Sequence, residues 1–240
     1  MDAVLLIGLI FASYLIGSVS FGRILSARQK VDVTTQGSGN TGATNMLRTY
    51  GAKLGFLTLL FDLIKGVVPA LVGFFAFGGV GAMPDSYIGL YACGLSAVIG
   101  HIFPIYYRFK GGKAAATAFG VFLVAQPVIA LCSFLLCFGL AIVFKYVSPM
   151  SLLFIVINVI WQCFFMPEFT PVASASVAVV LLVVALGVAV WCAHWKNIVR
   201  LVKGVENKTD IWGKITEKLK KNKTENNPET KSIDTENGEK

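Results

Sequence analysis

Three polar stretches of this chain carry the residue types that bind phosphate groups. In the first, three glycines alternate with Ser, Asn and Thr between Gly37 and Arg48. Glycines let successive backbone N–H groups turn towards one anion, and hydroxyl and amide groups add hydrogen bonds. An arginine can grip phosphate oxygens in two places at once. We interpret this stretch as a phosphate-binding loop; the alternative is a flexible polar loop whose glycines only allow tight turns. The candidate ligands are Ser38, Gly39, Asn40, Thr41, Gly42, Thr44, Asn45 and Arg48.

The second stretch runs from Gly100 to Lys113 and contains His101. Near its end a Gly-Gly pair lies between two lysines, which places flexible backbone beside cations. The spacing G-x-x-x-x-G-K-[ST] of a P-loop is missing. The alternative interpretation is ordinary positive charge that keeps a loop in the cytoplasm. The candidate phosphate ligands here are Lys110, Gly111, Gly112 and Lys113.

The third stretch follows the last apolar run and extends from His194 to Lys208. Its apolar residues recur at helical spacing opposite basic ones, which predicts an amphipathic helix at the membrane interface. A plain basic stop after a membrane span is the alternative. The candidate site residues are His194, Asn197, Arg200 and Glu206.

Together the three stretches offer many cations, hydroxyls and amides but few carboxylates. Magnesium-dependent phosphotransfer needs clustered Asp or Glu, so this pattern disfavours it. Neither a G-x-S-x-G elbow nor an H-x-x-x-x-D box occurs in the sequence. The five cysteines lie in apolar runs without a C-x-x-C pair, and the two histidines are far apart. We therefore expect no metal site and no cofactor.

The composition is that of an integral membrane protein. Of 240 residues, 55% are hydrophobic and 14% are charged, with a mean hydropathy of +0.71; soluble domains carry about 25% charged residues. We expect the net charge of +8 to help set the orientation of the protein in the membrane and to attract anionic groups. No nucleic-acid recognition module is present, and we expect no nucleic-acid partner.

The apolar runs predict an all-α fold with about seven transmembrane helices. The run over 114–144 is too long for one crossing, and Pro127 divides it. Two crossings there satisfy the positive-inside rule, with the N-terminus outside and the C-terminus cytoplasmic. All three polar stretches then meet on the cytoplasmic face. The predicted spans cover 3–21, 54–77, 87–106, 114–126, 127–144, 150–165 and 172–193.

Two charged residues, Asp62 and Lys65, fall within the second predicted span. They lie three residues apart, on one face of a helix. We favour an internal ion pair that fixes helix packing; the alternative is that Lys65 faces an anionic substrate. We expect residues 1–210 to form a single membrane domain and 211–240 a basic, then disordered, cytoplasmic tail.

The three stretches occur in the order and spacing found in bacterial acyl-phosphate:glycerol-3-phosphate acyltransferases of the PlsY type. The chain resembles that family over about residues 1–210. Three departures stand out. Residues 114–117 read Ala-Ala-Ala-Thr where the family usually has Gly-Val-Ala-Thr. Trp195 replaces a frequent arginine, and Ser20 replaces a usual proline.

The resemblance implies acyl transfer from acyl phosphate to glycerol 3-phosphate, giving lysophosphatidate and phosphate. It implies a multi-pass protein of the bacterial cytoplasmic membrane, with its active site on the cytoplasmic side. Membrane lipid and a soluble acyl-phosphate-producing enzyme are the further partners it suggests. The catalytic residues would be Ser38, His194 and Asn197, and the other candidates would bind the substrates or their phosphates.

Two other functions fit parts of the pattern. A transporter of an anionic phosphorylated metabolite would explain many spans and an intramembrane charge pair. However, the sequence has no inverted repeat, and its cations gather near one face. A non-catalytic lipid-binding scaffold would explain the tail but not the three polar stretches.

Overall fold

The computed structural model describes residues 3–29, 31–78, 85–165, 173–214 and 216. Helices and turns make up this part of the chain, and it contains no strand. The predicted turns within 79–84 and 166–172 and most of the predicted tail lie outside the described residues. In chain order the helices are α1 (Ala3–Ser18), α2 (Phe21–Ala27), η1 (Val33–Thr35), α3 (Ala43–Tyr50), α4 (Ala52–Ala76), α5 (Asp85–Ile102), η3 (Ile105–Tyr107), α6 (Ala115–Ala125), α7 (Pro127–Phe144), α8 (Val147–Phe164), α9 (Ala173–Ala193) and α10 (Trp195–Val202).

Five helical segments of the described chain are long and apolar enough to cross a membrane. The number rises to six if α9 and α10, which meet at a bend of 58°, form one span. The predicted helical membrane architecture is therefore present. The predicted number of seven depends on α6, whose 11 residues extend about 16 Å against a hydrocarbon core of about 30 Å.

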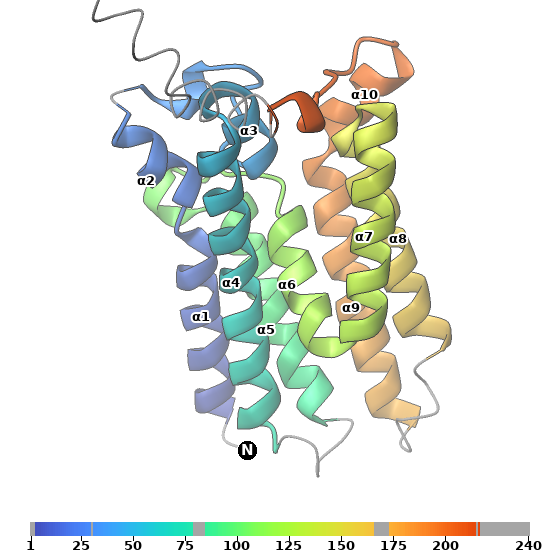
Figure 1. The fold of residues 1–240 in the computed structure, drawn as a ribbon. Coiled ribbons are helices and arrows are strands. Elements are labelled where there is room, and N and C mark those ends of the chain that lie inside the picture. Colours follow the sequence, from blue (N-terminus) through green and yellow to red (C-terminus); the bar gives the residue numbers. More distant parts are fainter. Residues whose placement is uncertain (1–2, 30, 79–84, 166–172, 215, 217–240) are drawn as a thin grey trace, which may run out of the picture.

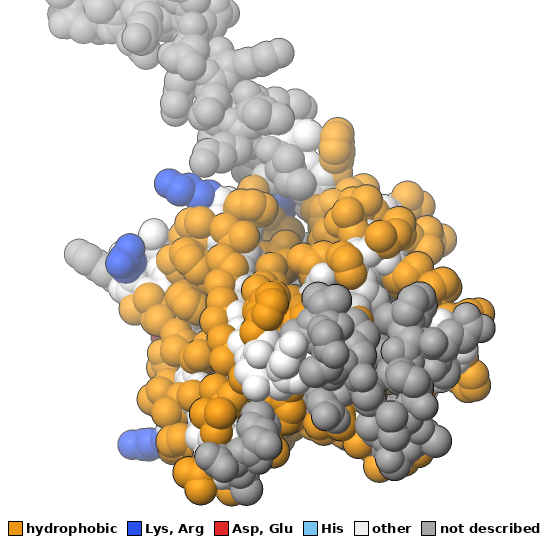
Figure 2. Space-filling model, turned by 90° about the horizontal axis from the view of Figure 1, so that it is seen from below, with side chains coloured by type: hydrophobic (Ala, Val, Ile, Leu, Met, Phe, Trp, Pro, Cys, Tyr) orange, Lys and Arg blue, Asp and Glu red, His pale blue; other side chains and the backbone are white. Residues whose placement is uncertain are grey.

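The long helices lie side by side, and the polar elements α2, α3 and α10 gather at one end of the bundle (Figure 1). We call this the polar end. Seen from the opposite end, the described surface is mostly hydrophobic (Figure 2). Helix α6 starts near the polar end and stops short of the opposite end, where α7 turns back beside it (Figure 1).

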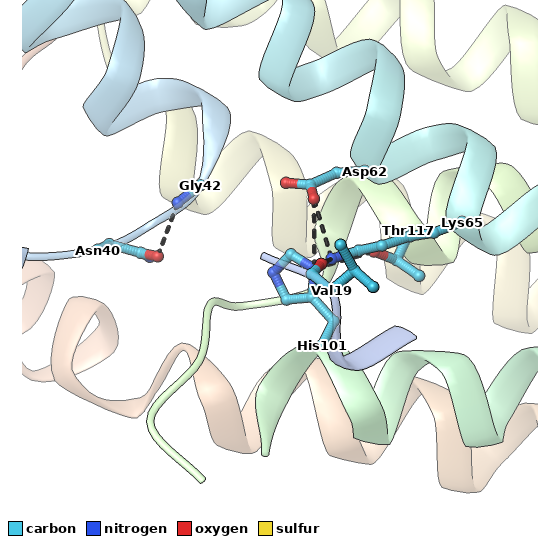
Figure 3. Close-up of polar contacts among 7 residues, drawn as sticks. All are labelled: Val19, Asn40, Gly42, Asp62, Lys65, His101 and Thr117. Atoms are coloured by element: carbon cyan, nitrogen blue, oxygen red, sulfur yellow. Dashed lines mark hydrogen bonds and ion pairs between the residues drawn. The ribbon is translucent and has the colours of Figure 1, made fainter. Parts of the chain in front are cut away.

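The first apolar segment is broken, whereas the sequence predicts one continuous helix. Val19 and Ser20 are not helical, so the chain leaves α1 and re-enters a helix at α2. The break frees the carbonyl oxygen of Val19, which accepts a hydrogen bond of 2.8 Å from Lys65 Nζ. Lys65 also pairs with Asp62 at 3.0 Å (Figure 3), and both side chains are 3% exposed. The predicted internal ion pair is thus present.

The first polar stretch is only partly a loop. The sequence places a loop over 22–53, but this region contains α2, η1 and α3, and α3 begins inside the candidate phosphate loop at Ala43. Gly22 lies directly beneath the backbone of Thr41, where any Cβ would overlap the carbonyl oxygen. This close contact fixes the polar stretch against the end of the bundle.

Small residues bring α4 and α6 together. A Cβ on Gly66 would overlap the carbonyl oxygen of Thr117, and one on Gly120 would overlap that of Leu63. Reciprocal contacts of this kind are typical of helices that pack inside a membrane. They hold the start of α6, and the Lys113 that precedes it, at a fixed height beside α4.

Ala114, which stands where the resembled family usually has glycine, has an unusual backbone conformation. Ala114 precedes α6 with φ +58° and ψ 14°, in the left-handed region, and is 2% exposed. This conformation is about 1–2 kcal/mol less favourable for a residue with a Cβ. The chain therefore keeps a conformation that suits glycine although it carries alanine.

We expect Ala114→Gly to leave the free energy of unfolding unchanged or to raise it by up to about 1 kcal/mol. Relief of the backbone strain offsets the greater freedom that glycine has in the unfolded chain. Ala116→Gly is the matched control, since Ala116 lies in the first turn of α6 and glycine costs about 1 kcal/mol in a helix. Thermal unfolding in detergent measures both. An equal loss of stability in the two variants would contradict the strain argument.

Candidate active site

A cavity of about 380 Å³ opens at the polar end and extends into the bundle between α4, α6, α7 and α8. Its lining changes from polar residues of the three stretches to mostly aromatic and aliphatic side chains of the helices, with Asp62 of α4 as a charged exception. The predicted site residues that line it are Ser38, Asn40, Gly42, Thr44, Asn45, Arg48, Lys113 and His194.

The candidate phosphate loop is built around the side chain of Asn45. This residue is 1% exposed. Its Oδ1 accepts a hydrogen bond from the backbone N–H of Ser38 at 3.0 Å. Its Nδ2 donates to the carbonyl oxygens of Gln36 and Asn40 at 3.0 and 2.9 Å. Asn45 therefore holds the loop in shape, and its amide bonds are already used within the loop.

Three N–H groups of the predicted anion nest have partners of their own, one of them that of Gly39, which donates to the carbonyl oxygen of Gln36 at 2.9 Å. That of Ser38 bonds to Asn45, and that of Gly42 donates to Asn40 Oδ1 at 3.1 Å (Figure 3). Further donors for an anion are the first-turn N–H groups of α3, which have no acceptor within the helix. Ala43 and Thr44 carry them and both line the cavity.

Two cations of the site lie beside this helix start. Arg48 lies one turn into α3, with its Nε 3.4 Å from the carbonyl oxygen of Thr44. Burial lowers the pKa of Arg48, but an arginine stays protonated at physiological pH. Burial lowers the pKa of Lys113 to about 8; Glu206 opposes this shift, and Arg200 and Arg48 add to it. A bound anion would relieve the repulsion among these cations.

The Gly-Gly pair of the second stretch packs tightly against His101. The N–H of Gly112 donates to the carbonyl oxygen of His101 at 3.0 Å, and a Cβ on either glycine would overlap His101 atoms. His101 Nδ1 lies 3.1 Å from Thr117 Oγ1 and 3.7 Å from Asp62 Oδ1 (Figure 3). The glycines therefore serve close packing that fixes the backbone leading to Lys113.

His194 joins the cavity from the junction of α9 and α10. Its Nδ1 lies 2.8 Å from the carbonyl oxygen of Val190, so this nitrogen carries the proton and Nε2 is left as an acceptor. Burial is the main cause that lowers the pKa of His194 to about 4. The imidazole is therefore neutral at pH 7.

The rest of the third stretch forms a hydrogen-bonded cluster around Glu206, which is 7% exposed. Asn197 Nδ2 and Ser148 Oγ donate to Glu206 Oε1 at 2.6 and 2.8 Å. Arg200 Nε donates to Glu206 Oε2 at 2.9 Å. Burial raises the pKa of Glu206, but these hydrogen bonds together lower it below its usual value. The cluster ties α10 and the chain after it to the start of α8.

Not all candidates reach the cavity wall. Lys110 is exposed, and its carbonyl oxygen accepts a hydrogen bond of 3.3 Å from Arg23. The members of the predicted set that do not line the cavity are Gly39, Thr41, Lys110, Gly111, Gly112, Asn197, Arg200 and Glu206.

Most of the other lining residues carry no motif in the sequence, and three of them stand out. Ser148 and Ser151 begin α8, where the sequence shows only an apolar span and no motif. Ile211 belongs to the predicted tail, yet it lines the cavity and is 5% exposed. The position of Ile211 follows from the fold, in which the chain after α10 lies against the end of α7. A hydrogen bond of 2.7 Å from the N–H of Thr209 to the carbonyl oxygen of Lys145 holds it there.

Comparison with known proteins connects this chain to one family. The family model described as "Glycerol-3-phosphate acyltransferase" matches residues 7–204. The chain is 38% identical over 200 residues to the glycerol-3-phosphate acyltransferase of Aquifex aeolicus, covering 83% of this chain and 97% of that one. It is 40% identical over 206 residues to that of Shouchella clausii, covering 85% and 95%.

Solved structures agree with the sequence relatives. The glycerol 3-phosphate form of PlsY (YgiH), an integral membrane glycerol 3-phosphate acyltransferase, superposes with a TM-score of 0.74 at 35% identity, covering 85% of this chain and 94% of that one. The lysophosphatidic acid form of PlsY superposes with the same TM-score at 34% identity, covering 88% and 98%. The fold and the membrane setting are therefore shared.

The pKa of Lys113 predicts how phosphate binding depends on pH. In the empty protein Lys113 loses its proton as the pH rises through about 8, so the affinity for a phosphate monoester should fall above that pH, by up to about tenfold per pH unit. The monoester is already dianionic there. Titration calorimetry with phenyl phosphate between pH 7 and 10 measures the effect. Lys113→Arg should remove the decline, because arginine keeps its charge; a decline that persists would assign it to another group.

Proposed function

The chain belongs to the glycerol-3-phosphate acyltransferase family, and we propose that it takes its acyl group from an acyl phosphate. The acceptor is the C1 hydroxyl of glycerol 3-phosphate, and the products are lysophosphatidate and inorganic phosphate. This reaction is the first acylation of phospholipid synthesis. Family membership favours this enzyme activity over the transporter that the sequence left open.

The observation that carries the proposal is the division of the cavity into a cationic end and an apolar end. Arg48 and Lys113 lie at the polar end, and aromatic rings of α6, α7 and α8 line the deeper part. Both proposed substrates bring a phosphate, and only the donor also brings a long apolar chain. One cavity with these two ends suits an acyl phosphate whose phosphate meets the cations while its chain enters the bundle.

The proposed reaction is a direct attack without a covalent acyl-enzyme. The C1 oxygen of glycerol 3-phosphate forms a bond to the acyl carbon, and the bond from that carbon to the phosphate oxygen breaks. The hydroxyl proton ends on the released phosphate. Arg48, Lys113 and the first-turn N–H groups of α3 stabilise the charge that develops on the phosphate.

His194 and Asn197 are assigned to orienting the hydroxyl, and Ser38 to binding beside the phosphate. The neutral imidazole of His194 has its Nε2 free to accept a hydrogen bond from that hydroxyl, because Nδ1 donates to Val190. Asn197 does not line the cavity, so its proposed part is indirect: its Nδ2 donates to Ser148 and Glu206 and holds the chain beside His194 in place. Ser38 is one of the residues that line the cavity.

The proposed setting is the bacterial cytoplasmic membrane with seven crossings. The N-terminus lies outside, and the polar end with the C-terminus lies in the cytoplasm. In support, α6 and α7 run in opposite directions from the turn at Gln126 (Figure 1), so a short seventh crossing fits. A soluble enzyme that makes acyl phosphate would then deliver its product to the polar end.

The first test offers purified protein glycerol 3-phosphate with palmitoyl phosphate and, separately, with palmitoyl-CoA, without added metal. Lysophosphatidate should form from the acyl phosphate only. Product from palmitoyl-CoA would support the acyltransferase activity but contradict the proposed acyl-phosphate donor. The absence of product from both, with folded protein, would overturn the proposed reaction.

Arg48→Ala and Lys113→Ala should each lower kcat/KM at least about a hundredfold, on the scale of a lost charge-stabilising donor. Thermal unfolding should change little. Lys53→Ala is the matched control, because Lys53 is exposed at the start of α4 and does not line the cavity. Near-normal turnover in both site variants would remove these residues from the proposed mechanism.

A further inference from the structure

Between α6, α7 and α8 the cavity ends on aromatic rings, whereas the deepest lining residue of α4 is Asp62. Helices α6 and α8 run inwards from the polar end, and their deepest lining residues are Phe119 and Phe154. Helix α7 runs the opposite way, and its deepest lining residue is Phe134. Three neighbouring helices therefore each contribute a phenylalanine at the depth where the cavity stops. We call these three residues the aromatic floor.

The rings of the aromatic floor contact one another. Phe119 and Phe134 are stacked, with ring centroids 4.4 Å apart and an interplanar angle of 9°. Phe119 and Phe154 meet edge to face at 5.4 Å. Phe119 is 7% exposed and Phe154 is 4% exposed. The floor is thus a continuous packed surface that blocks further entry.

A buried polar network supports the floor from the other side. Gln126 Nε2 donates to Asn158 Oδ1 at 2.9 Å, and Asn158 Nδ2 donates to Ser133 Oγ at 2.9 Å. None of the three side chains is more than 5% exposed. Because unpaired amides are costly inside a membrane, these bonds resist separation of α6, α7 and α8. The helices that carry the floor are therefore fixed relative to one another.

We propose that the aromatic floor sets the longest acyl chain that the enzyme uses efficiently. The inference rests on the proposed function, in which the chain of the acyl phosphate occupies the apolar part of the cavity. A chain that reaches the rings gains contact with them, whereas a longer chain must displace rings held by packing. One methylene more or less in such a pocket changes kcat/KM by about 10–200-fold.

One side of the cavity faces the bilayer, which gives the chain a competing route. Phe56 on α4 and Phe138 on α7 line the cavity and are 62% and 37% exposed. Phe138 also stacks on Phe134, with centroids 5.7 Å apart, so it extends the aromatic surface towards this side. A chain that left through the side would make the enzyme indifferent to the depth of the floor.

The test is a competition among acyl phosphates of 12 to 20 carbons. Purified protein receives an equimolar mixture with glycerol 3-phosphate, and mass spectrometry gives the chain distribution of the lysophosphatidate. Phe134→Ala should move the optimum to longer chains by about two carbons or more, and Phe134→Trp should move it to shorter ones. Phe144→Ala, an exposed position on the same helix outside the cavity, should leave it unchanged.

An unchanged distribution in folded Phe134→Ala and Phe134→Trp would overturn the floor and favour the lateral route. Thermal unfolding identifies folded variants, and Phe134→Leu and Phe119→Leu replace any variant that fails to fold. An absence of product from every acyl phosphate in the unaltered protein would instead overturn the proposed function, and the floor with it.

Discussion

The buried pair of Asp62 and Lys65 is the interaction on which the rest of the structure depends. Inside a membrane neither charge is tolerable alone, so the pair must form and its remaining bonds must be found nearby. Lys65 finds the carbonyl oxygen freed at Val19. Asp62 lies near His101, against which the Gly-Gly turn packs. The pair thereby connects the break in the first span to the turn that leads to Lys113.

The electrostatics of the polar end follow from where the carboxylates are used. Among the described residues near the site, Glu206 is engaged by Arg200, Asn197 and Ser148. Burial is the main cause of the lowered pKa of Lys113; Arg200 and Arg48 add to it, and Glu206 opposes it. In the described part of the chain, the salt bridge of Glu206 is with Arg200, not with Arg48 or Lys113. This arrangement is unfavourable when empty and becomes favourable when a phosphate enters. The same feature that binds the substrate thus makes Lys113 sensitive to pH.

Much of the fold and the convergence of the three stretches could be predicted, because long apolar runs and positive loops obey simple rules. The roles of particular amides and glycines could not. The residue type of Asn45 suggests a phosphate ligand, yet its side-chain amide forms its hydrogen bonds within the loop. Gly111 and Gly112 read as flexible backbone, yet they pack against His101. Residue type identifies a possible donor, but only the fold shows whether that donor is already used.

The aromatic floor shows why the depth of a site inside a membrane protein is hard to predict from sequence. Its rings come from three helices and are indistinguishable, by local pattern, from the other phenylalanines among the 18 in the chain. What selects them is the short α6. Because Pro127 starts α7 after only 11 residues of α6, the turn at Gln126 lies within the bundle, and its polar groups must be satisfied there. The hydrogen bond from Gln126 Nε2 to Asn158 meets part of that need, although Gln126 Oε1 stays buried without a partner among the described residues. The packed rings above this turn become the end of the cavity.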